Sequence, residues 1–210
     1  MLFFLDTTNE QMKFTAIIFL TLLPTLCFCQ TAKEFAQDGV AKSKNKDYEG
    51  AIADYNKSIK LDSTNSIVFY NRGLAKSRQK DFLGAIADYS KSIQLKDDPE
   101  TYYVRALMKV ELKDYKGTLE DLNKAYDAKK ESPNFYFLRG DCRFLTTDYN
   151  DAITDFDKAI ELKQDFAKAY LFRGLSQLNL KNKDKACSDF SKAKSLNLTQ
   201  ADEFITKYCN

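Results

Sequence analysis

Apolar and polar residues follow one recurring helical pattern that dominates the chain. In the stretch 47–62, alanine, tyrosine and isoleucine side chains recur every three or four residues, with lysine, asparagine and aspartate between them. This spacing is typical of an amphipathic helix that buries one face. Copies of the stretch return at 81–95, 114–126 and 148–162, and a weaker copy lies at 184–194. The pattern therefore predicts five copies of one helical unit.

A second helix is expected before each of these copies. A small residue marks the same place in every one of these preceding helices, at Gly39, Gly73, Ala106, Gly140 and Gly174. The intervals are 34, 33, 34 and 34 residues, and the short one coincides with the connection 97–99. Tandem helix–turn–helix units of about 34 residues indicate a repeat array. We expect an all-α fold in which neighbouring units stack, because a single helix pair cannot bury its apolar face alone.

When the five units are aligned, the residues at equivalent positions form columns. These columns resemble the tetratricopeptide repeat over residues 32–198. The family's small residue at the close helix crossing falls on Ala51, Ala85, Thr118, Ala152 and Ala186. The aromatic residue that follows falls on Tyr55, Tyr89, Phe156 and Phe190, with Leu122 departing from the pattern. The later small residue falls on Ser58, Ser92, Ala125, Ala159 and Ala193.

This resemblance implies a right-handed α-α superhelix of about eleven helices with a concave and a convex face. The five units are expected at about 32–65, 66–98, 99–132, 133–166 and 167–198. Residues 199–210 are expected to form a capping helix that covers the last unit. An aspartate precedes most second helices and is expected to act as its N-cap, at Asp47, Asp81, Asp114 and Asp148.

Two charged columns run through the units. Every second helix carries an aspartate, and four first helices carry an arginine just before the small residue. The first unit has Asp38 in the arginine column and the capping helix has Lys207, which suggests that each cation reaches back to the preceding unit. The predicted pairs are Asp54–Arg72, Asp88–Arg105, Asp121–Arg139, Asp155–Arg173 and Asp189–Lys207. The alternative is a charged binding strip.

A partner-binding groove is expected on the first helices, which line the concave face in this family. Helical spacing places an apolar, aromatic-rich stripe there, and such a stripe usually marks an interaction site. The alternative is that some of these side chains only pack between neighbouring first helices. The predicted groove residues are Tyr70, Leu74, Tyr103, Leu107, Phe137, Asp141, Phe144, Leu171 and Leu175.

Residues 1–29 lie outside the repeat and resemble a secretory signal peptide, with Met12 as the expected true start. Met12 and Lys13 precede an apolar run of about thirteen residues, which is shorter than a membrane span. Small residues follow, and cleavage is expected before Gln30. A lipid-attached cysteine at Cys27 or Cys29 and an uncleaved anchor are the alternatives. The pattern predicts a secreted, periplasmic or cell-envelope protein of bacterial type.

Three cysteines remain after Gln30. Cys142 is expected in the core of the fourth unit. Cys187 begins the last second helix and Cys209 ends the capping helix, so antiparallel packing would bring the two close together. A Cys187–Cys209 disulfide and a pair of free thiols both stay open at this point, although an oxidising compartment favours the disulfide.

Composition narrows the function classes further. The 32 basic and 30 acidic residues give a net charge of +2, so there is no electrostatic case for nucleic-acid binding. The chain has no histidine, which excludes histidine bases and histidine metal ligands. We expect a non-enzymatic scaffold that binds another protein without a cofactor, and that meets a membrane only through its N-terminus. The alternatives are glycan or peptidoglycan binding through Tyr70, Tyr103 and Phe137, an accessory domain of an enzyme complex, and an enzyme that uses Asp141 and Glu111.

Overall fold

The computed structural model describes residues 30–209, and this part of the chain consists of helices joined by short connections. The predicted signal peptide lies outside the described residues. Five helix pairs and a terminal helix account for most of the described chain. The helices are α2 (Ala32–Lys44), α3 (Tyr48–Leu61), α4 (Ser66–Arg78), α5 (Phe82–Leu95), α6 (Pro99–Glu111), α7 (Tyr115–Lys124), α8 (Tyr126–Lys129), α9 (Pro133–Leu145), α10 (Tyr149–Leu162), α11 (Ala167–Asn179), α12 (Lys183–Ser195) and α13 (Gln200–Tyr208).

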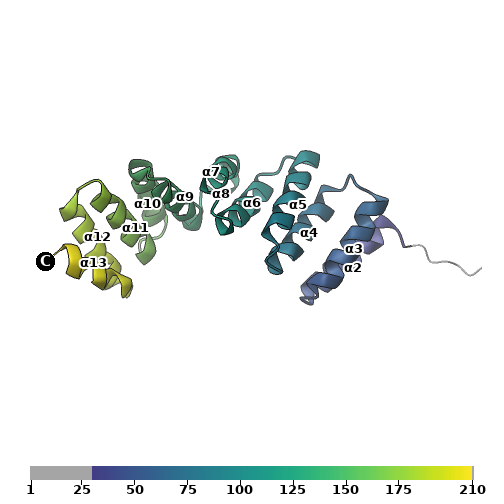
Figure 1. Ribbon diagram of the computed structural model, residues 1–210, viewed down its shortest axis with the longest axis horizontal. Coiled ribbons are helices and arrows are strands. Elements are labelled where there is room, and N and C mark those ends of the chain that lie inside the picture. Colours follow the sequence, from purple (N-terminus) through teal and green to yellow (C-terminus); the bar gives the residue numbers. More distant parts are fainter. Residues whose placement is uncertain (1–29, 210) are drawn as a thin grey trace, which may run out of the picture.

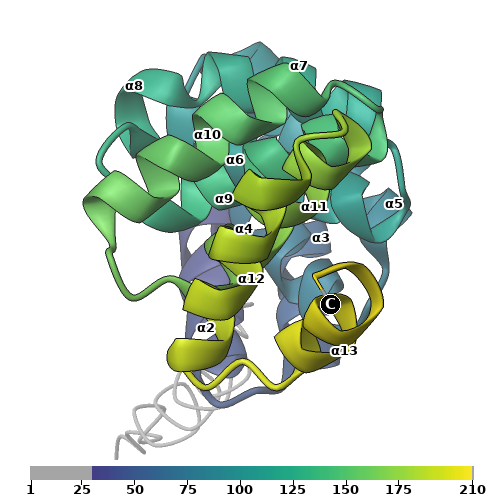
Figure 2. The same ribbon diagram turned by 90° about the vertical axis from the view of Figure 1, so that its left-hand side faces the viewer.

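The pairs stack in a row from α2 and α3 at one end to α12 and α13 at the other (Figure 1). In this view the row forms an arch whose middle pairs lie above both ends. Seen along the row in Figure 2, successive pairs turn about the long axis. The predicted all-α solenoid of antiparallel helix pairs is thereby confirmed.

The third unit differs from the others because its second helix is interrupted. α7 ends at Lys124, and the four-residue helix α8 follows directly after Ala125. The described chain therefore has twelve helices rather than the eleven expected. The interruption falls where Tyr126 replaces the isoleucine of the first, second and fourth units, at Ile59, Ile93 and Ile160. The tyrosine ring is partly exposed and packs edge-on against Phe135, with 6.2 Å between the ring centroids.

Four of the five helix pairs cross closely at a glycine that faces an aromatic ring. A Cβ atom added to Gly39, Gly73, Gly140 or Gly174 would lie only 2.6–2.8 Å from the ring of Tyr55, Tyr89, Phe156 or Phe190. These rings are almost completely buried. The third unit has a different pair, in which Ala106 stands opposite Leu122, and both are fully buried. Because leucine is smaller than an aromatic ring, the alanine Cβ can be accommodated there.

Four second helices begin at an aspartate, and three of these aspartates act as side-chain caps. Asp47, Asp81 and Asp114 each accept a hydrogen bond of 2.9 Å from the backbone N–H of a glycine three residues later. Asp148 makes no such bond, so its predicted capping role is wrong. A Cβ atom at the capped glycines would lie within 2.1–2.3 Å of the aspartate oxygen, and Asp151 has a Cβ at this position. The three caps thus occur where the capped residue is glycine, and the fourth unit has Asp151 there instead.

The glycine–ring contact leads to a testable prediction. Gly73→Ala should destabilise the protein, because overpacking costs about 1–3 kcal/mol and outweighs the roughly 1 kcal/mol that alanine gains in helix propensity. Adding Tyr89→Leu reproduces the pair of the third unit and should recover part of this loss. Urea unfolding of both single variants and the double variant measures the coupling, for which we expect about 1 kcal/mol or more. A Gly73→Ala variant as stable as the parent protein would contradict the prediction.

Candidate partner-binding groove

The predicted groove residues occupy equivalent places on the first helices α4, α6, α9 and α11. Eight of the nine are half-buried, so each keeps part of its side chain at the surface. The exception is Leu171, which is only 4 % exposed and belongs to a core cluster with Phe190 and Ala193. Leu171 therefore packs inside the last unit and offers no surface to a partner, and we remove it from the groove.

The stripe on α9 is built from aromatic rings that also join the fourth and fifth units. The centroid of Phe137 lies 5.0 Å from that of Phe166 and 5.6 Å from that of Phe172. Phe144 lies two turns further along α9 and contacts the same Phe172 ring, with centroids 5.8 Å apart. These rings have a packing role, as the alternative interpretation proposed, and they still leave part of their surface uncovered.

On α4, Tyr70 borders an open hollow of about 170 Å³ between the second and third units. Its ring packs against the buried Tyr89 ring at 5.8 Å between centroids. The hollow is also lined by Ile67, whose side chain is 63 % exposed. Sequence reasoning missed Ile67, although it lies three residues before Tyr70 and therefore shares its helical face. Ile67 extends the apolar stripe towards the start of α4.

Tyr103 on α6 lies beneath a cation supplied by the short helix α8. The Nζ atom of Lys129 is 5.0 Å from the centroid of the Tyr103 ring, and the same ammonium group pairs with the carboxylate of Glu100. Burial raises the pKa of the Tyr103 phenol, so this ring enters the groove as a neutral side chain. The interruption of α7 thus places Lys129 next to a predicted groove residue.

Asp141 is the one charged residue among the predicted groove residues. Burial raises the pKa of its carboxyl group. Within residues 30–209, the carboxylate makes neither a hydrogen bond nor an ion pair. Glu111, the second carboxylate of the hypothetical enzyme site, is exposed at the end of α6.

The charged columns form ion pairs within each unit, and the predicted pairing with the preceding unit is wrong. Arg72 binds Asp88 through two nitrogens, with Nη2–Oδ1 at 2.6 Å and Nε–Oδ2 at 2.9 Å. Arg105 binds Asp121 in the same way, at 2.7 and 2.8 Å. The remaining pairs of this kind are Arg139–Asp155 and Arg173–Asp189. The arginine reaches the partner helix of its own hairpin, sixteen residues further along the chain.

A second cation column, which sequence reasoning missed, completes these sites. It lies four residues after the arginine on the same face of the first helix, and its members are Lys42, Lys76, Lys109 and Arg143. In the first unit, which lacks the arginine, Lys42 and Lys57 hold Asp54. In the sequence these four residues are visible as a second column of basic residues that recurs with the period of the repeat.

The arginines also link neighbouring units, but through a different residue. The Nη1 atom of Arg72 donates a hydrogen bond of 2.7 Å to Asn56 of the preceding unit. Arg105 donates in the same way to Ser90 at 2.9 Å, and Arg173 pairs with Asp157. The column aspartates are nearly completely buried and each is bound by cations of its own unit. Their carboxylates are therefore occupied, which argues against a charged binding strip.

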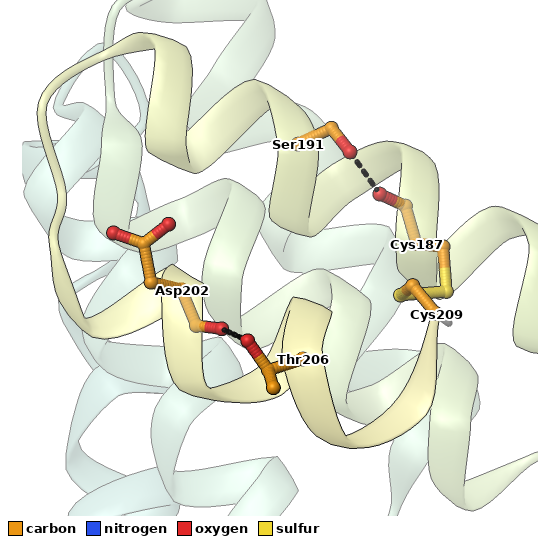
Figure 3. Close-up of a disulfide and its surroundings, with 5 residues drawn as sticks. All are labelled: Cys187, Ser191, Asp202, Thr206 and Cys209. Carbon is orange, nitrogen blue, oxygen red and sulfur yellow. Dashed lines mark hydrogen bonds between the residues drawn. A yellow bond between two sulfur atoms is a disulfide. The ribbon is translucent and has the colours of Figure 1, made fainter.

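The cysteines of the last unit form a disulfide between Cys187 on α12 and Cys209 at the end of α13 (Figure 3). Their Cα atoms are 5.6 Å apart, and the bond closes a loop across 22 residues. This bond fastens the terminal helix onto the fifth unit. Cys142 is a free thiol in the core, and burial raises its pKa to about 12, so it is unreactive as a nucleophile.

No group of three or more potential metal ligands occurs within residues 30–209. In the same range, no helix combines the length and apolarity needed to cross a membrane.

Comparison with models of protein families identifies the family of this chain. Residues 43–80 match a model described as TPR repeat, and residues 133–166 and 167–200 each match the model described as tetratricopeptide repeat. Together these matches span about half of the chain, so the protein belongs to the tetratricopeptide repeat proteins. A search among curated proteins found no significant match.

Solved structures with the same fold extend the comparison. The structure described as "YrrB: a TPR protein with an unusual peptide-binding site" superimposes with a TM-score of 0.79 at 20 % identity, covering 84 % of this chain and 92 % of that one. The MamA protein gives a TM-score of 0.72 at 23 % identity, covering 84 % and 94 %. MamA from Desulfovibrio magneticus RS-1 gives 0.72 at 19 %, covering 80 % and 96 %. These similarities show the fold, and no enzyme family is evident among them.

The ion pairs lead to a prediction that separates the observed pairing from the one expected. A double-mutant cycle with Arg105→Met and Asp121→Asn should give a coupling energy of about 1 kcal/mol or more, because the pair is buried and bidentate. The matched cycle with Asp88→Asn and Arg105→Met should give less than about 0.5 kcal/mol. Both are measured by urea unfolding. Stronger coupling in the second cycle than in the first would contradict the observed pairing.

Proposed function

We propose that the protein is a non-enzymatic binding module that holds an extended segment of a partner protein against its first helices. The observation that carries this proposal is the half-buried stripe on α4, α6, α9 and α11. Its side chains keep part of their surface uncovered although apolar residues predominate there. A soluble partner segment would cover this surface and so gain the free energy of apolar burial.

The tetratricopeptide repeat family supports this function, because its members use the concave face to bind other proteins. The printed description of the YrrB structure adds a peptide-binding site on a chain of the same fold. The ladder of ion pairs does not compete for the role, since its carboxylates are bound internally. The rings of Tyr70, Tyr103 and Phe137, which the glycan alternative requires, each contact a neighbouring ring, which leaves them less suited to stacking on a sugar.

The groove is tested best at side chains that lie in the stripe and make no ring contacts. We expect Leu74→Ser combined with Leu107→Ser to lower peptide binding at least about tenfold, because apolar burial drives the association. Binding is measured by panning a random peptide display library with the parent protein and titrating the enriched peptides.

Leu83→Ser provides the matched control. Leu83 is 71 % exposed on the second helix α5, so its loss should leave both helicity and peptide affinity unchanged. Equal affinities for the parent protein and the Leu74/Leu107 double variant, with intact circular dichroism, would refute binding in the groove.

We further propose that the protein acts outside the cytosol, in the bacterial envelope or beyond it. Two features support this location: the signal-like N-terminal sequence and the Cys187–Cys209 disulfide, a type of bond that persists mainly in oxidising compartments.

The location predicts the covalent state of the protein recovered from cells. N-terminal sequencing should begin at Gln30, and the unfolded, unreduced chain should show one reactive thiol, that of Cys142. Reduction before unfolding should raise this to the three thiols of Cys142, Cys187 and Cys209. An intact N-terminus together with five thiols in the unreduced protein, which include those of Cys27 and Cys29, would contradict export.

A further inference from the structure

Asp141 breaks the apolar pattern of the groove at one position. The equivalent residues on the other first helices are Leu74, Leu107 and Leu175, with Val40 in the first unit. All of them are half-buried, as is Asp141. A column that is otherwise aliphatic therefore carries one carboxylate, near the middle of the row of helices.

The surroundings of Asp141 are apolar. Phe137 lies four residues before it and Phe144 three residues after it, so helical spacing puts all three side chains on one face of α9. Both phenylalanine rings pack nearly perpendicular to Phe172 of α11, with centroids 5.6 and 5.8 Å away. The carboxylate is thus placed between two aromatic side chains on the face that meets the next first helix.

No cation of the described chain neutralises this carboxylate. The arginines of the same helix, Arg139 and Arg143, are both bound to the buried Asp155. Every fully buried side-chain nitrogen or oxygen within residues 30–209 has a hydrogen-bond partner. Because the carboxylate of Asp141 has none there, its oxygens must remain accessible from solvent, and a ligand can reach them.

Without a bound ligand, this arrangement lowers the stability of the folded protein. A half-buried carboxylate loses hydration without gaining a counter-charge, and burial accordingly raises its pKa. A leucine, as in the neighbouring units, would fill the position without this cost. A cation that binds the carboxylate offsets this loss of stability. The ion pair is stronger where apolar side chains exclude water.

We propose that Asp141 binds the lysine or arginine side chain of an extended partner segment, in which apolar residues flank the basic residue and contact the leucines of the same column. This inference rests on the proposed function and adds the charge and pattern of the partner. The groove is complementary to such a segment, because it offers one negative charge between the apolar positions Leu107 and Leu175.

The test uses peptides selected from a random display library by the protein itself. The enriched peptides should share one basic residue at a fixed distance from apolar residues. For a synthetic peptide of this consensus, replacing the basic residue by methionine should weaken binding to the parent protein about tenfold or more, as expected for a partly desolvated ion pair.

Variants at Asp141 provide the decisive comparison. Asp141→Asn should bind the basic and the methionine peptide with similar affinity, and Asp141→Leu should prefer the methionine peptide. Glu120→Gln, which removes an exposed carboxylate on the second helix α7, serves as the control and should bind like the parent protein. Thermal unfolding accompanies each titration, and Asp141→Leu should melt no lower than the parent protein.

The possible failures are distinguishable. Enrichment of purely apolar peptides, bound equally by the parent protein and by Asp141→Asn, would overturn this inference and leave the proposed function standing. A marked loss of thermal stability in both Asp141 variants would assign the carboxylate a structural role instead and would also overturn it. A parent protein that enriches no peptide at all would reject the proposed function and this inference together.

Discussion

The close crossing of two helices within each unit is the contact on which the rest of the structure depends. A glycine on the first helix lets its backbone approach the second helix, and an aromatic ring fills the space beside it. The ring leaves no room for even one more carbon atom, as the distances from an added Cβ at Gly73 to Tyr89 demonstrate. The third unit preserves the fit by exchanging both partners, alanine for glycine and leucine for the ring. The steric relation between the two positions is therefore what the repeat maintains.

Ion pairs also hold together the two helices of each unit. In the three middle units the buried aspartate receives two cations from the first helix of its own unit. In the first unit Lys42 of the first helix and Lys57 of the second helix hold Asp54, and in the last unit Arg173 alone binds Asp189. The remaining guanidinium nitrogen connects some arginines to the preceding unit, as from Arg72 to Asn56. Burial of a charge is tolerated here because every carboxylate is paired and hydrogen-bonded. The electrostatic network thus stabilises single units first and their stacking second.

These packing demands leave the first-helix stripe as the surface free to vary. Leu171 belongs to the core, and Phe137 and Phe144 join neighbouring units while remaining partly exposed. Asp141 serves neither purpose, since it has no partner within the described chain and its burial is unfavourable. A residue that the fold does not need, at a place where a ligand would lie, is where specificity should be sought.

The sequence by itself determined the class of fold, the number of units and the columns that pack. Small and aromatic residues at a fixed period leave few ways to bury their surfaces, so Gly73 and Tyr89 were identifiable without coordinates. It also supplied both cysteines of the disulfide, although their pairing depended on how α13 folds back on α12.

Only the tertiary structure decided which charges meet and which groove residues stay at the surface. The sequence asymmetry between Asp38 and Lys207 suggested pairing with the preceding unit, yet a side chain is bound by whichever partner lies within reach of its tip. For Arg105 that partner is Asp121, across its own hairpin. The cap at Asp148 is likewise absent although its sequence position is equivalent to that of the three capping aspartates. Periodicity reveals that positions are equivalent, whereas distances of a few ångströms between side chains depend on how the helices cross.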